Sequence, residues 1–93
     1  MIKGFKDGET ELIWQGTRSR RLPPDIQAVS RRKLRMLNNA HHLDDLRLPP
    51  ENRLEALKGN RKGQYSIRIH EQSRICSGWH DGSSLDVEIV DYH

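Results

Sequence analysis

The sequence has little of what would cross-link the chain or hold it in a membrane. Its one cysteine, Cys76, excludes an internal disulfide framework, and a lone thiol is typical of a reducing compartment. No apolar run reaches the length that crosses a bilayer, and the first residues lack the pattern of a secretory signal peptide. We therefore expect a cytoplasmic protein with no membrane partner.

Motifs for cofactors, metals and covalent catalysis are also missing. There is no glycine-rich loop for phosphate binding and no serine or cysteine triad signature. Of the 5 histidines, two are adjacent and the others scattered, and none makes a recognised ligand spacing with Cys76. We expect neither a metal site nor a cofactor.

The length and charge of the chain indicate its domain number and the character of its surface. A chain of 93 residues predicts a single domain over 1–93, with a thin core because only 33% of residues are hydrophobic and 31% are charged. The net charge is +3 and the isoelectric point about 9.4. This excess indicates either a solvated basic surface or a surface for a polyanion such as RNA.

Two helices are predicted in the first half, after a weak first strand in "MIKGF". Asp7 as N-cap and Gly16 as C-terminal stop bound a short helix that presents Leu12 and Ile13. A longer helix runs from about Pro24 to Asn39, because proline suits a first turn and apolar residues recur near helical spacing. Its apolar stripe, which Lys33 interrupts, is formed by Ile26, Val29, Met36, Leu37 and Ala40. The arginines off that stripe, either solvated or in contact with RNA phosphates, are Arg31, Arg32 and Arg35.

Strands dominate the second half, after a long connection over 41–63. Alternating apolar residues predict strands over 64–70, 74–80 and 85–93, and the Asp-Gly in "HDGSS" predicts a hairpin between the last two. The element order β-α-α-β-β-β gives an α+β domain, with two N-terminal helices packed on a mostly antiparallel sheet.

Several stretches resemble a known family. "NRLEALKGNRKGQYSIRI", "RIC", the closing "VEIVDYH" and the opening "MIKGF" are similar to HigB-type toxins, or plasmid-maintenance killer proteins, of the RelE superfamily. The similarity spans nearly the whole chain and implies a compact RelE-like fold. It also implies a ribosome-dependent endoribonuclease that cuts mRNA in the ribosomal A site. The implied partner is a HigA-type helix-turn-helix antitoxin. Operator DNA would be bound only by the complex of toxin and antitoxin.

The resemblance assigns candidate catalytic residues. Lys58 in "LKG" stands where the family has a catalytic lysine, and Arg74 in "RIC" matches an arginine near the scissile phosphate. The last three residues supply an acid or base in His93, a proton acceptor or orienting group in Asp91, and a stacking or hydrogen-bonding group in Tyr92. Such a site needs no cofactor when the RNA 2′-hydroxyl is the nucleophile. The candidates for binding RNA phosphates are Arg53, Arg61, Lys62 and Arg68.

Each of these residues also has an ordinary structural interpretation, as a surface charge or an exposed polar terminus. In a regular strand Asp91 and His93 share a face and Tyr92 opposes them, so joint action on one substrate requires the strand to end or twist there. Glu55 stands where one branch of the family has histidine, and is either a substitute proton acceptor or a surface carboxylate.

Two serines depart further from the family. Ser73 and Ser77 flank "RIC" where many relatives have tryptophan and phenylalanine, and period two places them on the face of Ile75 and Trp79. Losing a core phenylalanine costs roughly 3–5 kcal/mol, so we hypothesise compensation elsewhere or a weakened toxin. The alternative function is a non-catalytic module of the same fold that binds RNA or the antitoxin.

Overall fold

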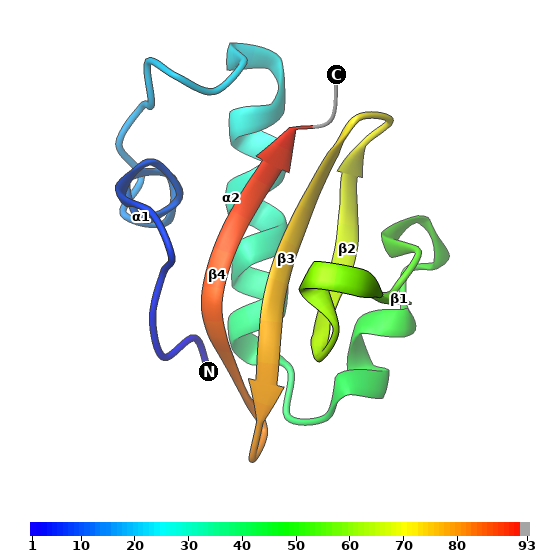
Figure 1. Ribbon diagram of the computed structural model, residues 1–93. Coiled ribbons are helices and arrows are strands. Elements are labelled where there is room, and N and C mark those ends of the chain that lie inside the picture. The colour runs from blue at the N-terminus through cyan, green and yellow to red at the C-terminus, as the bar shows by residue number, and fades with distance from the viewer. Residues whose placement is uncertain (92–93) are drawn as a thin grey trace.

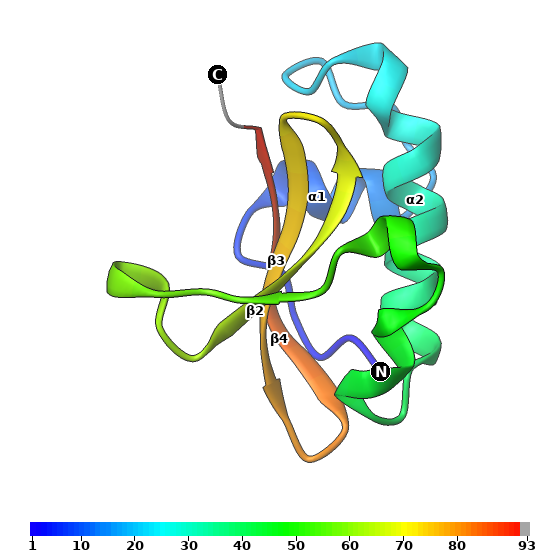
Figure 2. The same cartoon turned by 90° about the vertical axis from the view of Figure 1, so that its right-hand side faces the viewer.

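A computed structural model describes residues 1–91 as two helices packed with one four-stranded antiparallel sheet (Figures 1 and 2), which confirms the predicted α+β fold. The strands lie in the order β1-β2-β3-β4. The helices are α1 (Gly8–Trp14) and α2 (Pro24–Asn39), and the strands are β1 (Glu55–Ala56), β2 (Gln64–His70), β3 (Ser73–His80) and β4 (Ser83–Asp91). Short 3-10 turns cover Leu43–Arg47, Pro50–Asn52 and Gly59–Arg61. Neither α1 nor α2 has the length and apolar character that would let it cross a bilayer.

The N-terminal segment differs from the strand that its sequence predicts. Residues 1–6 make two isolated parallel bridges to β4, at Ile2–Ser84 and Phe5–Val87. The segment is too short for a regular strand because α1 begins at Gly8. It still covers the edge of β4, with Lys3 N–H donating to the Ser84 carbonyl at 2.8 Å. An exposed sheet edge is thereby closed to pairing with other chains.

The longer helix has the predicted bounds, and its buried face is polar at two positions. Ile26, Leu34 and Leu37 enter the core, and Ser30 and Lys33 are buried beside them. Lys33 Nζ donates a hydrogen bond to Asn52 Oδ1, so the lysine ties α2 to the turn Pro50–Asn52. Burial, together with the charge of Arg32, lowers the pKa of Lys33, whereas Glu51 raises it to a lesser extent.

The hairpin between β3 and β4 forms at the predicted Asp-Gly. Asp81 (φ 49°) and Gly82 (φ 75°) both have left-handed backbone conformations, which a two-residue hairpin turn with the favoured twist requires. His80 and Ser83, which directly flank the turn, are register partners.

One face of the sheet packs on α2, and it carries both serines. Ile67, Ile75 and Ile89 lie in the core cluster, and Ser73 and Ser77 are 2% and 4% exposed. Ser77 lines a cavity of only about 10 Å³, which is room for about one water molecule; the other lining residues are leucines, isoleucines, Ser66 and Tyr65, which is the register partner of Ser77. Neighbouring side chains therefore fill the space of an aromatic ring at this position, which favours compensation over a weakened core.

Candidate functional site

The face of the sheet that is turned away from α2 carries a row of polar side chains. Register pairs join Glu55 of β1 to Ser66 of β2, Ser66 to Cys76 of β3, and Cys76 to Glu88 of β4. Figure 2 shows α2 on one side of the sheet and the loop between β1 and β2 protruding on the other. The candidate site lies on this outer face, where Ser66 and Cys76 in the middle of the row are buried and Glu55 at its end is exposed.

Arg74 is held on this face by contacts with three other residues. Its Nε donates a hydrogen bond of 2.7 Å to Ser66 Oγ, and its Nη2 donates one of 2.7 Å to the carbonyl of Arg53. Glu55 Oε2 lies 3.5 Å from the same Nη2. The Arg74 side chain is 18% exposed, so the guanidinium is fixed against the sheet with one part left open to solvent.

Backbone geometry places the Arg53 carbonyl in this position. Arg53 ends the turn Pro50–Asn52 in the left-handed conformation (φ 45°, ψ 56°), which is uncommon for a residue other than glycine. Its N–H donates to the Pro50 carbonyl at 3.0 Å. The turn therefore presents a backbone acceptor to a guanidinium that originates 21 residues further along the chain.

The loop between β1 and β2 holds three of the predicted basic residues in different environments. Arg61 Nη1 donates to Gln64 Oε1 at 3.0 Å and to Glu88 Oε1 at 3.1 Å, so an ion pair already engages its charge. Lys58 and Lys62 are exposed at the two ends of the turn Gly59–Arg61. Within residues 1–91 the Lys58 side chain has no hydrogen-bond or ion-pair partner, and its charge faces solvent.

The remaining predicted phosphate-binding residues lie at the side of the sheet. Arg53 is exposed, and Arg68 is the direct partner of Arg74 across β2 and β3. Arg68 lines a cleft of about 420 Å³ that also has Glu51 and Glu71 in its wall. Lys33 and His70 lie in the same wall, and no ion pair joins Arg68 to either carboxylate among residues 1–91.

Asp91 lies on the opposite side of the sheet from Arg74. Asp91 is the register partner of Ser73, and Arg74 is the partner of Val90. Ser73 Oγ donates a hydrogen bond of 2.9 Å to Asp91 Oδ1. The described strand thus does not bring Asp91 onto the face of Arg74. The other two predicted terminal residues, Tyr92 and His93, lie outside the described residues.

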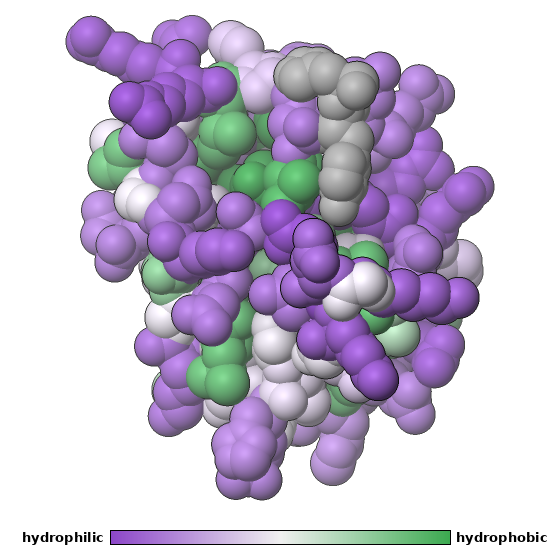
Figure 3. Space-filling model, viewed as in Figure 1, coloured by the Kyte–Doolittle hydropathy of each residue, from purple (hydrophilic) through white to green (hydrophobic). Residues whose placement is uncertain are grey.

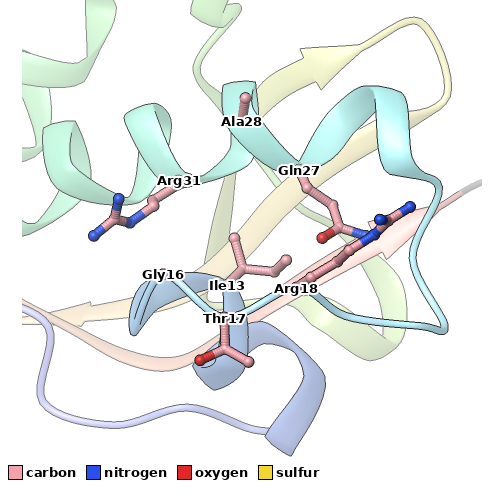
Figure 4. A pocket seen from close by; sticks show the side chains of 7 residues that line it. All are labelled: Ile13, Gly16, Thr17, Arg18, Gln27, Ala28 and Arg31. Carbon is pink, nitrogen blue, oxygen red and sulfur yellow. The ribbon is translucent and has the colours of Figure 1, made fainter.

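The face viewed in Figure 1 is mostly hydrophilic, with hydrophobic patches between the polar side chains, as Figure 3 shows. A separate depression of about 210 Å³ lies where α1 ends and α2 begins, with Ile13 and Ala28 in its lining (Figure 4). That depression contains none of the predicted site residues. Residues 1–91 hold no group of three or more side chains suited to a metal ion.

Sequence reasoning missed two residues of the outer face. Ser66 lies in "QYSIRI" between two apolar neighbours, and Glu88 alternates with core residues of β4 in the same way. Their spacing places them on a polar face, but their partners depend on cross-strand register. That register includes a shift between Cys76 and Gly78, which no local pattern marks.

Comparison with known proteins identifies the family of the chain. Residues 3–93 match the family described as the RelE-like toxin of the type II toxin-antitoxin system HigB. The chain therefore belongs to the HigB-like toxins, and as the toxin of a type II system it pairs with an antitoxin.

Two relatives show how far the similarity extends. Toxin HigB-1 of Vibrio cholerae serotype O1 is 42% identical over 87 residues, which cover 92% of each chain. An uncharacterised protein of Haemophilus influenzae is 35% identical over 69 residues, which are 73% of this chain and 68% of that one.

Proposed function

We propose that this toxin is a ribosome-dependent endoribonuclease that cuts mRNA in the ribosomal A site and so arrests translation. The observation that carries the proposal is the fixed guanidinium of Arg74 on a hydrophilic face of the sheet. Family membership supports it, because the arginine lies in the "RIC" motif that the resemblance assigns to the scissile phosphate.

The proposed chemistry uses only the RNA and side chains. A base removes the proton of the 2′-hydroxyl, the 2′-oxygen attacks the adjacent phosphorus, and an acid protonates the departing 5′-oxygen. Arg74 and Lys58 would stabilise the negative charge that develops on the phosphorane. His93 is the proposed acid or base, Asp91 a proton acceptor or orienting group, and Tyr92 a stacking or hydrogen-bonding group, with no cofactor or metal in the step.

We expect the basic residues to contribute unequally to RNA affinity. Arg53, Lys58 and Lys62 are exposed and offer their charges to phosphates. Arg61 is ion-paired with Glu88, so its contribution to RNA affinity would be smaller, and Arg68 is half-buried in a cleft of mixed charge. The ribosome would supply the orientation of the mRNA, which is a large part of the catalytic effect in such a reaction.

The proposed partners follow from the same assignment. The antitoxin would be of the HigA helix-turn-helix type, and operator DNA would be bound only through the toxin–antitoxin complex. The site of action would be the cytoplasm, where translating ribosomes carry the substrate.

Induction of the toxin in cells tests this proposal. We expect new mRNA 5′ ends on translated messages only, and their loss in Lys58→Ala and His93→Ala. Lys3→Ala and His80→Ala are matched controls, because both side chains are exposed and lie outside the proposed site. Growth arrest by a folded toxin without new ends would instead identify a non-catalytic module that binds RNA or the antitoxin.

A further inference from the structure

We propose that Ser66 is a positioning residue that orients the Arg74 guanidinium toward the scissile phosphate. This inference rests on the proposed endoribonuclease function. It assigns to Ser66 the task of holding one edge of the guanidinium, so that the opposite end is free for the substrate.

The sheet places Ser66 within reach of Arg74. Ser66 is the register partner of Cys76, two residues beyond Arg74 on the same face, so serine and arginine are diagonal neighbours on adjacent strands. A long side chain spans that diagonal. The direct partner of Arg74 is Arg68, whose like charge disfavours contact. The arginine therefore lies toward the serine rather than straight across the strands.

Burial makes Ser66 a fixed acceptor. The residue is 1% exposed, whereas Arg74 retains an 18% exposed side chain. The 2.7 Å bond from Arg74 Nε to Ser66 Oγ is charge-assisted, and such bonds are stronger than bonds between neutral groups. A buried hydroxyl cannot follow the arginine into solvent, so the arginine adopts the geometry that the hydroxyl sets.

The contacts of the guanidinium determine which end is presented. Nε bonds Ser66, and Nη2 bonds the Arg53 carbonyl at 2.7 Å. These two atoms form one edge of the planar group, and both acceptors belong to the protein. Nη1 makes no hydrogen bond to residues 1–91. A phosphate oxygen can thus approach Nη1, and a second oxygen would reach Nη2 in the paired geometry of guanidinium groups only in place of the Glu55 carboxylate, which lies 3.5 Å from Nη2.

A single-turnover assay with ribosomes that hold mRNA in the A site tests the inference. We expect Ser66→Ala to slow cleavage about tenfold, which corresponds to the loss of one hydrogen bond to a charged group. Ser66→Thr keeps the hydroxyl and suits a strand, so it should cleave at nearly the rate of the unmodified toxin. Arg74→Ala should slow cleavage more than Ser66→Ala, because it removes the cation itself.

The double variant Ser66→Ala/Arg74→Ala separates positioning from a structural role. If Ser66 acts through Arg74, the second substitution has no further effect on the rate. A parallel readout is the Nε–H resonance of Arg74 in a ¹⁵N spectrum, which should exchange slowly with water in the unmodified toxin and rapidly in Ser66→Ala. If Ser66 has only a structural role, that resonance stays protected. Ser66→Ala then slows cleavage by the same factor in the toxin with Arg74 and in the Arg74→Ala variant.

The outcomes that overturn the inference are distinct. Full activity of Ser66→Ala, or an equal loss in the Arg74→Ala background, removes the positioning role and leaves the endoribonuclease proposal intact. Full activity of Arg74→Ala removes the arginine from the reaction, and the role of Ser66 with it. Absence of cleavage by the unmodified toxin overturns the proposed function and this inference together.

Discussion

Ser73 and Asp91 face each other across β3 and β4, and the Ser73 hydroxyl donates a hydrogen bond of 2.9 Å to Asp91 Oδ1. Ser73 is buried, so the bond fixes the last described residue of the chain to the sheet. The serine that stands where the resemblance predicts an aromatic residue therefore has a specific partner, and that partner is one of the proposed active-site residues.

Ser73→Ala should weaken the end of β4. Removing the donor is expected to lower the free energy of unfolding by about 1 kcal/mol. A double-mutant cycle with Asp91→Ala, measured by urea unfolding, isolates the coupling between the two side chains. Ser83→Ala at the other end of β4 is the control. Additive effects of Ser73→Ala and Asp91→Ala would contradict the pairing.

Much of the fold could be predicted because its signals are local. Pro24 and the apolar spacing after it define α2, and Asp81 with Gly82 defines the hairpin. Period-two alternation identified β2, β3 and most of β4. Each of these signals is contained in a few adjacent residues, so no knowledge of tertiary contacts was needed.

The features that escaped prediction depend on distant partners. β1 has two exposed residues and no alternation, and only its pairing with β2 defines it. Lys33 interrupts an apolar stripe in sequence but is buried, because Asn52 supplies an acceptor from a turn 19 residues away. The clamp on Arg74 combines Ser66 with the Arg53 carbonyl, which no pattern around the "RIC" motif indicates.

Ser77→Phe should destabilise the toxin rather than restore a missing core residue. The cavity beside Ser77 is about 10 Å³, far smaller than a phenyl ring, so the substitution forces neighbouring side chains apart. Overpacking of this kind typically costs about 1–3 kcal/mol, which should appear as a lower melting temperature. Ser77→Ala is the control that changes the hydroxyl without adding volume. A higher melting temperature for Ser77→Phe would show that the core is under-filled.

Glu55→Gln should improve substrate binding without changing the chemical step. The Glu55 carboxylate is 61% exposed and lies 3.5 Å from Arg74 Nη2, where it competes with a phosphate oxygen for the guanidinium. Because exposed ion pairs are weak, we expect the half-saturating concentration of programmed ribosomes to fall by no more than about fivefold. Glu11→Gln, exposed on α1, is the matched control.

The same kinetics distinguish the other roles of Glu55. A fall in the cleavage rate at saturation would identify the carboxylate as a proton acceptor in the reaction. Unchanged binding and rate would identify it as an ordinary surface charge. Either result would contradict competition with the phosphate.

Lys33 should make stability depend on pH in the alkaline range. Because burial lowers its pKa in the folded protein, the folded state holds fewer protons than the unfolded state between that lowered pKa and the ordinary value of 10.5. The free energy of unfolding then rises with pH across this window. The reason is that the folded state carries the cost of a buried charge at neutral pH, and deprotonation removes it.

Lys33→Met isolates this effect, since methionine fills a similar volume and does not titrate. Other alkaline groups titrate in both proteins and cancel in the difference between their unfolding free energies. In urea unfolding at several pH values, the unfolding free energy of the unmodified toxin should rise relative to that of Lys33→Met as the pH goes from neutral toward 10.5. Lys3→Met, at an exposed position, should give a difference that does not change with pH. A flat difference for Lys33→Met would mean that the lysine pays no cost for its burial, because Asn52 and Glu51 fully compensate the charge.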